Sequence, residues 1–386
     1  MNFGEMRRFR RDPLTFLEDF ARRNPEGVFR LPWGAWCVSD AELALTVLRD
    51  PIFNGGLSTF FGDLLPTRES QIALGRSVRN AMKARASEYR DNMFRAAPEL
   101  PEVSQWPATG PRLVYQCTKD LLLHPDSPPR LRRLMAEALN GGLMLRSPRI
   151  RQRARAEMLR PRLSAAVTEH VAARRRESTR NATPCDLLDA VISACPDDVS
   201  DPTVARLYML LFRSIVGSIG YAVAWSLLLA CLHSTPGSHW PWPADWIVRE
   251  AARHRPLVWM VGRTVPHPTD FGGIAFESGS VLSVSPYLLQ HDPRRWDRPK
   301  QFLPERWGEP DRCGPYLPFS AGPFTCAGAA VAHTMITAAV AAIAGNALLT
   351  VTGGDTRPVV TDAAASRRFT LYRAAAPTKA QTIERR

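Results

Sequence analysis

The chain has 386 residues, of which 45% are hydrophobic and 23% charged, and its formal net charge is +13. This length and composition are typical of a globular protein with a buried core, and they exclude a disordered or fibrous chain. We identify no uncharged apolar run long enough to span a membrane, and the N-terminal stretch lacks the apolar centre of a signal peptide. The sequence therefore predicts a soluble cytoplasmic protein without a membrane span.

The cysteines and the arginines limit the classes of site that the chain could carry. The seven cysteines are scattered and form no CxxC pair, so neither a disulfide framework nor a structural zinc site is expected. The arginines crowd into residues 146–163 and 171–180, but no known nucleic-acid-binding signature accompanies them. Apolar residues such as Met158, Leu159 and Leu163 recur there at helical spacing, which favours a solvated basic helix face over nucleic-acid binding. An acidic protein partner is consistent with the charge.

The first two thirds of the chain are predicted to be mainly helical after a mixed beginning. Residues 10–23 predict a helix, residues 27–40 a pair of strands joined by a Trp-Gly turn, and residues 41–51 a helix that ends at Pro51. From about 111 to 237 the pattern is helical. Its last segment, 201–233, starts with Asp-Pro and is apolar on nearly every face, which places it in the middle of the protein. Residues 140–148 could line an access route or simply pack.

The last third has a different texture. A helix at 244–256 is followed by short alternating strands within 263–289, a proline-rich meander over 291–319, a helix from 326 to about 344, and strands toward the C-terminus. We see no internal repeat and no clear linker. The expected fold is mainly α with small β-sheets in one domain, 1–386, with a helical core at about 111–350 and a smaller sheet-containing part near the N-terminus.

One motif points to a cofactor. Phe319, Gly322, Cys326 and Gly328 stand in the spacing F-x-x-G-x-x-x-C-x-G, which would arise by accident in about one chain in a thousand. The motif resembles the heme-binding loop of the cytochrome P450 family. A cysteine at a helix N-terminus faces unpaired N–H groups, which favours its thiolate, and the glycines leave room for a flat macrocycle. An inert buried cysteine is the alternative, and that description suits Cys117 better.

A second motif agrees with this resemblance. Glu250 and Arg253 form an E-x-x-R on a helix upstream of the cysteine, and Arg306 lies in the "PERW" of the meander. E-x-x-R occurs elsewhere in the chain, but only this copy has the order of helix, strands, meander and cysteine loop found in the family. The resemblance implies the cytochrome P450 fold and a structural cluster of these three side chains, because guanidinium groups and a carboxylate pair bidentately.

The resemblance also assigns residues around the cofactor. It implies that Cys326 is the axial ligand of the iron of heme b, and that Arg263 and Arg76 contact the heme propionates. Two departures follow from it. The family commonly has Arg or His two residues before the cysteine, where this chain has Phe324. The acid and alcohol of the oxygen-activating helix align with Gly217 and Ser218, so the acid is missing.

The missing acid leaves four accounts of the chemistry open. Waters and Ser218 suffice for proton delivery, the substrate supplies the polar group, peroxide is the oxidant, or catalysis is diverted toward oxidative coupling. The family resemblance implies a monooxygenase-type oxidoreductase that acts on a small organic molecule, free, carrier-bound or peptidic, in natural-product biosynthesis. Electrons would come from NAD(P)H through a separate, acidic ferredoxin or flavodoxin-type protein. The alternative is a non-catalytic relative that binds a partner or carrier protein.

Overall fold

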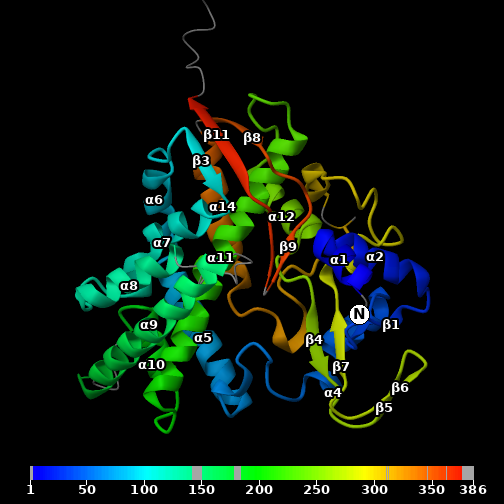
Figure 1. Cartoon of the computed structure of the whole chain (residues 1–386), viewed down its shortest axis with the longest axis horizontal. Helices are drawn as coiled ribbons and strands as arrows, with labels where there is room; N and C mark the ends of the chain where they lie inside the picture. Colours follow the sequence, from blue (N-terminus) through cyan, green and yellow to red (C-terminus); the bar gives the residue numbers. More distant parts are fainter. Residues whose placement is uncertain are drawn as a thin grey trace, which may run out of the picture.

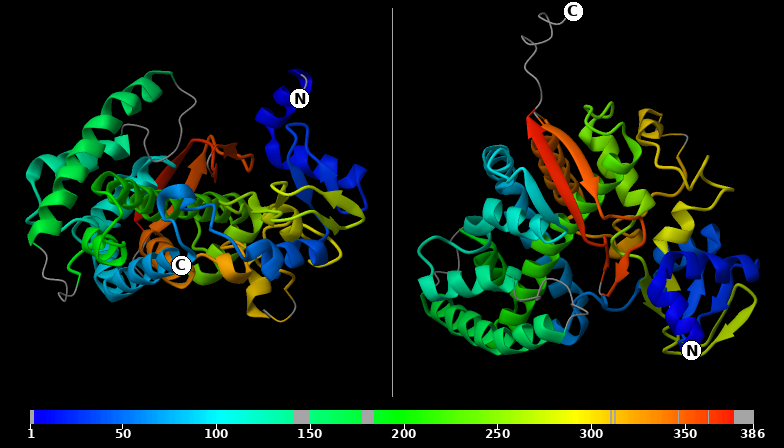
Figure 2. Two further views of the ribbon diagram at one scale, coloured as in Figure 1. Left: turned by 90° about the horizontal axis from the view of Figure 1, so that it is seen from below. Right: turned by 45° about the horizontal axis from the view of Figure 1, so that its top comes forward.

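The computed structural model describes residues 3–140, 150–177, 184–309, 311, 313–345, 347–361 and 363–375. Helices make up most of it, and helix α11 (Asp201–His233) runs through the middle (Figure 1). Helices α8 to α10 lie at one end of the molecule, and α1, α2 and β1 lie at the other (Figure 2). The prediction of a mainly helical protein with small sheets is confirmed.

The N-terminal elements follow from local capping signals. Asp12 accepts a hydrogen bond from the backbone N–H of Thr15, and Pro13 occupies the first helical position of α2, where its missing N–H costs nothing. Asp40 caps α3 in the same way, and α3 ends where Pro51 starts a new helix. The elements in this part are α1 (Phe3–Arg11), α2 (Pro13–Arg23), β1 (Val28–Arg30), β2 (Trp36–Val38), α3 (Ala41–Arg49), α4 (Pro51–Asn54) and η1 (Gly62–Leu64).

Helix α11 is the centre of the main core. It packs against α7, α9, α12 and α14, and it crosses α7 so closely that a Cβ added to Gly110 would lie 2.2 Å from the carbonyl oxygen of Gly220. Only glycine fits at such a crossing. The helices of this region are α5 (Arg68–Ala84), α6 (Ala86–Ala96), α7 (Thr109–Leu122), α8 (Pro129–Asn140), α9 (Ile150–Glu177) and α10 (Leu187–Ala194).

The same helix corrects the prediction about membrane spans. Among the described residues, α11 is the one helix long and apolar enough to cross a membrane by length and composition, so the statement that no such run exists is wrong. In its most apolar window, however, 72% of the residues are buried inside the protein. A core helix passes the same test as a membrane span, and burial of this degree is typical of a core helix.

Helix α9 carries most of the basic segment. Leu159, Leu163, Val167 and Val171 are buried as the helical spacing predicts, but Met158 is 75% exposed, so its assignment to the buried face is wrong. Not every arginine is solvated either. Arg174 pairs with Asp186 and Asp189, and Arg175 pairs with Asp201, which ties α9 to its neighbours α10 and α11. Residues 141–149 and 178–183, which include the candidate access segment, lie outside the described residues.

Two sheets join segments that are far apart in the sequence. The first has the strand order β1-β2-β7-β4, in which β2 pairs in parallel with β7 (Val281–Val284). The sheet predicted near the N-terminus is therefore completed by strands beyond residue 260. The second has the order β3-β11-β8 and joins β3 (Val103–Trp106) to the C-terminal strands (Figure 1).

The C-terminal third alternates short strands, helical turns and one long helix. Its strands over 261–284, its helix after the cysteine motif and its C-terminal strands confirm the sequence-based expectations for these segments. The expectation of strands up to residue 289 is wrong at its end, because Pro286–Gln290 form a short helix that Pro286 starts and Ser285 caps. The elements are α12 (Ala244–His254), β4 (Val261–Thr264), β5 (Thr269–Phe271), β6 (Ile274–Phe276), β7, α13 (Pro286–Gln290), η2 (Pro304–Gly308), η4 (Gly322–Phe324), α14 (Ala329–Ala344), β8 (Ala347–Thr352), β9 (Val359–Val360), β10 (Ala364–Ala365) and β11 (Phe369–Ala375).

Candidate active site

The cysteine motif forms a tight loop in front of α14. The backbone N–H of Cys326 donates to the carbonyl oxygen of Phe319 at 3.0 Å, which closes the loop. Gly322 has a φ of +71°, and a Cβ there would lie 2.0 Å from the carbonyl oxygen of Leu48 on α3. Ser320 also has a positive φ, +64°, which is uncommon for a residue other than glycine and costs conformational energy. The loop is therefore held in one shape by its close contact with α3.

Cys326 itself is exposed, whereas much of the inner face of α14 is buried. Although the residue is exposed, partial desolvation by the surrounding protein raises the pKa of its thiol, and the backbone N–H of Gly328 acts in the opposite direction without cancelling that effect. The expectation that the position before a helix N-terminus favours the thiolate is thus not met for the free thiol. Gly328 caps the helix, so Cys326 lies two residues outside it, where the helix dipole is weaker.

Helix α11 presents one exposed residue within a largely buried stretch. From Val216 to Cys231 only Ser218 is exposed, and Gly217 beside it is buried. Because α11 packs on α14 and the other residues of this stretch face protein, the exposed hydroxyl group marks a side of α11 that protein does not cover. Gly217 and Ser218, which the sequence analysis aligned with the oxygen-activating motif, both lie in this stretch.

The structure brings Glu250, Arg253 and Arg306 together in a buried cluster. Arg253 donates to Glu250 with Nε at 3.0 Å and Nη2 at 2.7 Å, and both side chains are fully buried. Arg306 Nε lies 3.2 Å from the same carboxylate. Arg253 also donates to backbone carbonyl groups of residues 290, 299 and 301, which fixes the meander onto α12.

Two further members of this cluster were missed in the sequence. Trp307 donates its indole N–H to Glu250 Oε2 at 3.1 Å, and the backbone N–H of Leu303 donates to Oε1 at 2.9 Å. The guanidinium groups of Arg253 and Arg306 lie 5.3 and 5.8 Å from the ring centre of Trp296. Trp307 directly follows Arg306, so the sequence could have suggested that its side chain is buried beside this arginine. Nothing in the sequence, however, shows that the partner of Trp307 is Glu250.

Arg263 lies near the cysteine loop and, within the described part of the chain, has only neutral partners. It is 6% exposed. Its Nε donates to Asn54 Oδ1 at 2.6 Å, its Nη1 to the carbonyl oxygen of Gly262 at 2.9 Å, and its Nη2 lies 3.5 Å from Ser320 Oγ. Burial without a compensating carboxylate lowers its pKa. A buried cation in this state fits an anionic ligand group.

The remaining candidate residues lie on α5. Arg76 is exposed, and the neighbouring Gly75 approaches the cysteine loop so closely that a Cβ on it would lie 3.3 Å from Ala327 Cβ. Ile72, one turn earlier, is 52% exposed, which is unusual for a large apolar residue on a packed helix. Arg68 at the start of α5 also reaches the loop, and sequence reasoning did not single it out.

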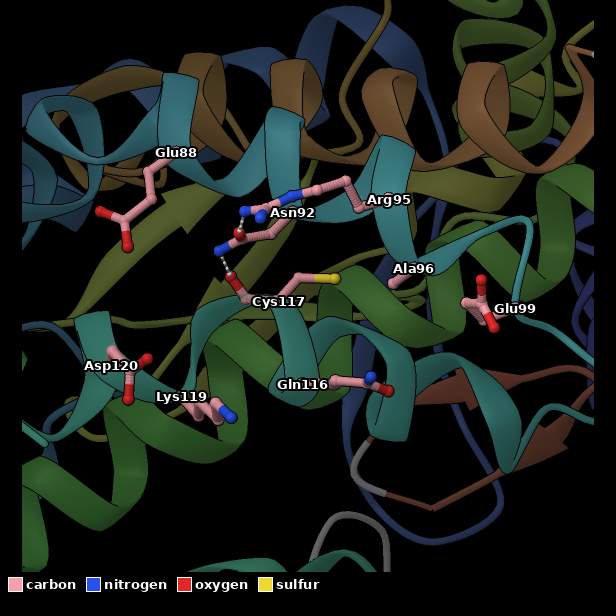
Figure 3. Close-up of a pocket in the computed structure, with 9 residues that line it drawn as sticks. All are labelled: Glu88, Asn92, Arg95, Ala96, Glu99, Gln116, Cys117, Lys119 and Asp120. Atoms are coloured by element: carbon pink, nitrogen blue, oxygen red, sulfur yellow. Dashed lines mark hydrogen bonds between the residues drawn. The ribbon is translucent and has the colours of Figure 1, made fainter.

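A surface hollow of about 390 Å³ lies elsewhere, between α6 and α7 (Figure 3). Its lining is polar and mixes acidic with basic side chains, and none of the residues of the cysteine loop, α11 or α12 contributes to it. Burial raises the pKa of the Cys117 thiol in its wall to about 11, so this cysteine is protonated near neutral pH. The hollow is therefore distinct from the candidate site.

Comparisons with known proteins agree with this geometry. The cytochrome P450 family model matches residues 244–360, which contain the buried cluster and the cysteine loop. A zebra fish cytochrome P450 solved with progesterone superposes with a TM-score of 0.74 and 19% identity, covering 94% of this chain and 99% of that one. Residues 244–360 therefore match the cytochrome P450 family, and the chain has the cytochrome P450 fold.

Two other similar proteins are informative. P450BioI, solved in complex with a fatty-acid-ligated acyl carrier protein, has a TM-score of 0.71 and 14% identity, and the match covers 95% of this chain and 99% of that one. Cyclooctatin synthase of Streptomyces melanosporofaciens is 32% identical over 189 residues, which are 42% of this chain and 41% of that protein. The sequence matches thus span less than half the length of the curated relatives.

The match to the family model implies a heme cofactor, and the residues present fit one. The exposed Cys326 offers a soft sulfur ligand of the kind that heme iron accepts. The close approach of the loop backbone to α3 at Gly322 leaves no side chain there, and the buried Arg263 has no carboxylate partner among the described residues. A ligand that has a metal centre and acidic edge groups would supply a metal for the Cys326 sulfur and an anion for Arg263.

Proposed function

We propose that this cytochrome P450 is a heme-thiolate monooxygenase-type enzyme that oxidises a small organic molecule in natural-product biosynthesis. The observation that carries the proposal is the exposed Cys326 in a loop that also neighbours the buried, anion-free Arg263. When bound, heme b supplies the redox chemistry that lets dioxygen and an electron pair oxidise a substrate. The resemblance to cyclooctatin synthase supports a biosynthetic role.

The side chains of the chain itself have separate tasks in this proposal. Cys326 would hold the heme iron through its sulfur. A thiol that serves as a metal ligand is bound as the thiolate, although desolvation raises the pKa of the free Cys326 thiol. Arg263 and Arg76 hold the acidic edge of the cofactor. Glu250, Arg253 and Arg306 do not touch it and keep the meander on α12, so their role is structural.

Proton supply is where this chain departs from its family. Ser218 offers a hydroxyl group on the uncovered side of α11, and Gly217 offers no side chain. A serine can relay a proton but is not itself a source of one near neutral pH. Protons therefore come from ordered water or from a polar group of the substrate, and peroxide use and oxidative coupling remain as routes that avoid this demand.

The surface charge suggests the kind of partner. A net charge of +13 favours an acidic electron donor, such as a ferredoxin or flavodoxin-type protein that passes on electrons from NAD(P)H. The carrier-protein complex of P450BioI supports a carrier-bound substrate as one option. We place the protein in the cytoplasm as a soluble enzyme, in accord with the burial of α11. A non-catalytic role as a carrier-binding protein is the alternative.

The spectrum of the purified protein tests the proposal. We expect the chain to bind heme, and its reduced carbon monoxide complex to have the strongly red-shifted Soret band of thiolate ligation. Cys326→Ala should abolish this band and leave most of the fold intact, whereas Cys313→Ala, which changes a half-buried cysteine earlier in the chain, should leave the band unchanged. A folded wild-type protein that stays colourless after heme is added would favour the non-catalytic alternative.

A further inference from the structure

Two arginines from distant parts of the chain meet at Phe324. This half-buried residue stands two positions before Cys326, where the family commonly has a basic residue. The guanidinium carbon of Arg263 lies 5.0 Å from the centre of its ring, and that of Arg68 lies 5.5 Å from the same point. Both distances are within the range of cation–π attraction, so the ring is a platform for both cations.

Asn54 accepts hydrogen bonds from the same two arginines. Its backbone carbonyl accepts a hydrogen bond from Arg68 Nη1 at 2.7 Å, and its side-chain Oδ1 accepts from Arg263 Nε at 2.6 Å. Asn54 is 1% exposed, and its amide group donates to the carbonyl oxygens of Val47 and Asp50 at 3.0 and 2.8 Å. The two guanidinium groups are thus fixed in position by groups that carry no charge.

This arrangement places like charges together without an anion. Among the described residues, no carboxylate forms an ion pair with Arg68 or Arg263, and Arg68 makes a single hydrogen bond, the one to Asn54. Two neighbouring cations repel each other, and the repulsion grows where protein excludes water. Such a pair is stable next to a bound anion, and it has donor N–H groups left over with which to hold one.

We propose that Arg68 and Arg263, positioned by Phe324 and Asn54, form a clamp for the carboxylate groups of the cofactor, in which Arg68 takes over the task of the basic residue absent at position 324. This inference rests on the proposed function, since it presupposes that heme binds at Cys326. It adds a residue outside the family motif and gives Phe324 a positioning role. The ligand group it predicts is a carboxylate, and the heme propionates are the carboxylates in question.

The first test compares heme with heme dimethyl ester, whose propionates are esterified and carry no charge. Binding of each form to the apoprotein is titrated by absorbance for wild type, Arg68→Gln and the matched control Arg79→Gln, which alters an exposed arginine on the same helix. With heme we expect Arg68→Gln to raise the dissociation constant about tenfold, and the control to change it less than about twofold. With the dimethyl ester, Arg68→Gln and wild type should bind alike.

The second test moves the positive charge from position 68 to position 324. In the double variant Arg68→Gln/Phe324→Arg, a basic residue returns to the position that it has in the family, and we expect it to recover much of the lost affinity for heme. Melting curves of each apoprotein verify that the variants fold. The clamp is refuted if Arg68→Gln binds heme like the control, if it weakens both heme forms equally, or if the double variant binds no better than Arg68→Gln. A wild type that binds neither form contradicts the proposed function itself.

Discussion

Two arginine clusters of this protein differ in how their charges are balanced. Around Glu250 the carboxylate accepts hydrogen bonds from Arg253, Arg306, Trp307 and the backbone, so the cluster is complete within the chain. Around Phe324, the cations of Arg68 and Arg263 have neutral partners only among the residues that the structure describes. We propose that the arginines paired with Glu250 stabilise the fold, and that the arginines at Phe324 hold a ligand.

Removing the centre of the complete cluster should have the largest effect. In Glu250→Ala two buried guanidinium groups lose their counter-ion, which costs about 3–5 kcal/mol of unfolding free energy. We expect little soluble heme-bound protein and a much lower melting temperature. Glu277→Ala, at an exposed position, is the control. If Glu250→Ala melted within a few degrees of this control, the cluster would not stabilise the fold as described.

The next prediction concerns the backbone of the cysteine loop. Gly322 and Gly273 both have positive φ, +71° and +75°, but only at Gly322 would a Cβ meet another atom, the carbonyl oxygen of Leu48. Gly273→Ala should cost about 1–2 kcal/mol for the left-handed backbone alone. Gly322→Ala adds a steric clash of about 1–3 kcal/mol, so we expect a lower melting temperature and a smaller heme content per chain. Equal losses in the two variants would mean that the loop can move away from α3.

The sequence was informative about the cluster around Glu250 and less informative about the arginines around Phe324. Glu250 and Arg253 are one helical turn apart on α12, so their pairing follows from helix geometry. Arg68 and Phe324 are 256 positions apart, and only the packing of α3, α4 and the start of α5 on the cysteine loop brings them together. The pairing of β2 with β7 has the same character. Hydrophobic periodicity predicts elements, but it does not carry the information that fixes such long-range contacts.

Two buried histidines near the Glu250 cluster should make the stability of the fold depend on pH. His254, next to Arg253, and His291 are buried, and desolvation together with nearby Arg253 and Arg255 lowers the pKa of both imidazoles well below the usual value. In the unfolded chain they take up protons below pH about 6.5. Stability should therefore be full above that pH and fall by up to about 1.4 kcal/mol per pH unit for each imidazole as the pH decreases.

His291→Asn isolates one imidazole of this pair. An asparagine amide can donate to the carbonyl oxygen of Tyr287, which His291 Nδ1 contacts at 2.9 Å. Urea unfolding at pH about 7.5 to about 5 should then show the smaller slope of a single buried histidine. His239→Asn, at an exposed position, is the control and should keep the wild-type slope. A slope unchanged in His291→Asn would contradict the assignment.

The smallest expected effect concerns helix α11, at Gly217 and the exposed Ser218. We proposed that Gly217 and Ser218 stand where the family has an acid and an alcohol, and Gly217 is buried. A carboxyl group in a buried place tends to stay protonated, which is the form that can give a proton. For Gly217→Glu/Ser218→Thr we expect a few-fold more product per NAD(P)H, about 1 kcal/mol or less in barrier height, and less peroxide released, with any substrate that a spectral screen supplies. Ser226→Ala, which removes another α11 hydroxyl bonded to its own helix, should change neither quantity. Unchanged or lower product in the double variant would mean that the acid-free helix suits oxidative coupling or peroxide chemistry instead.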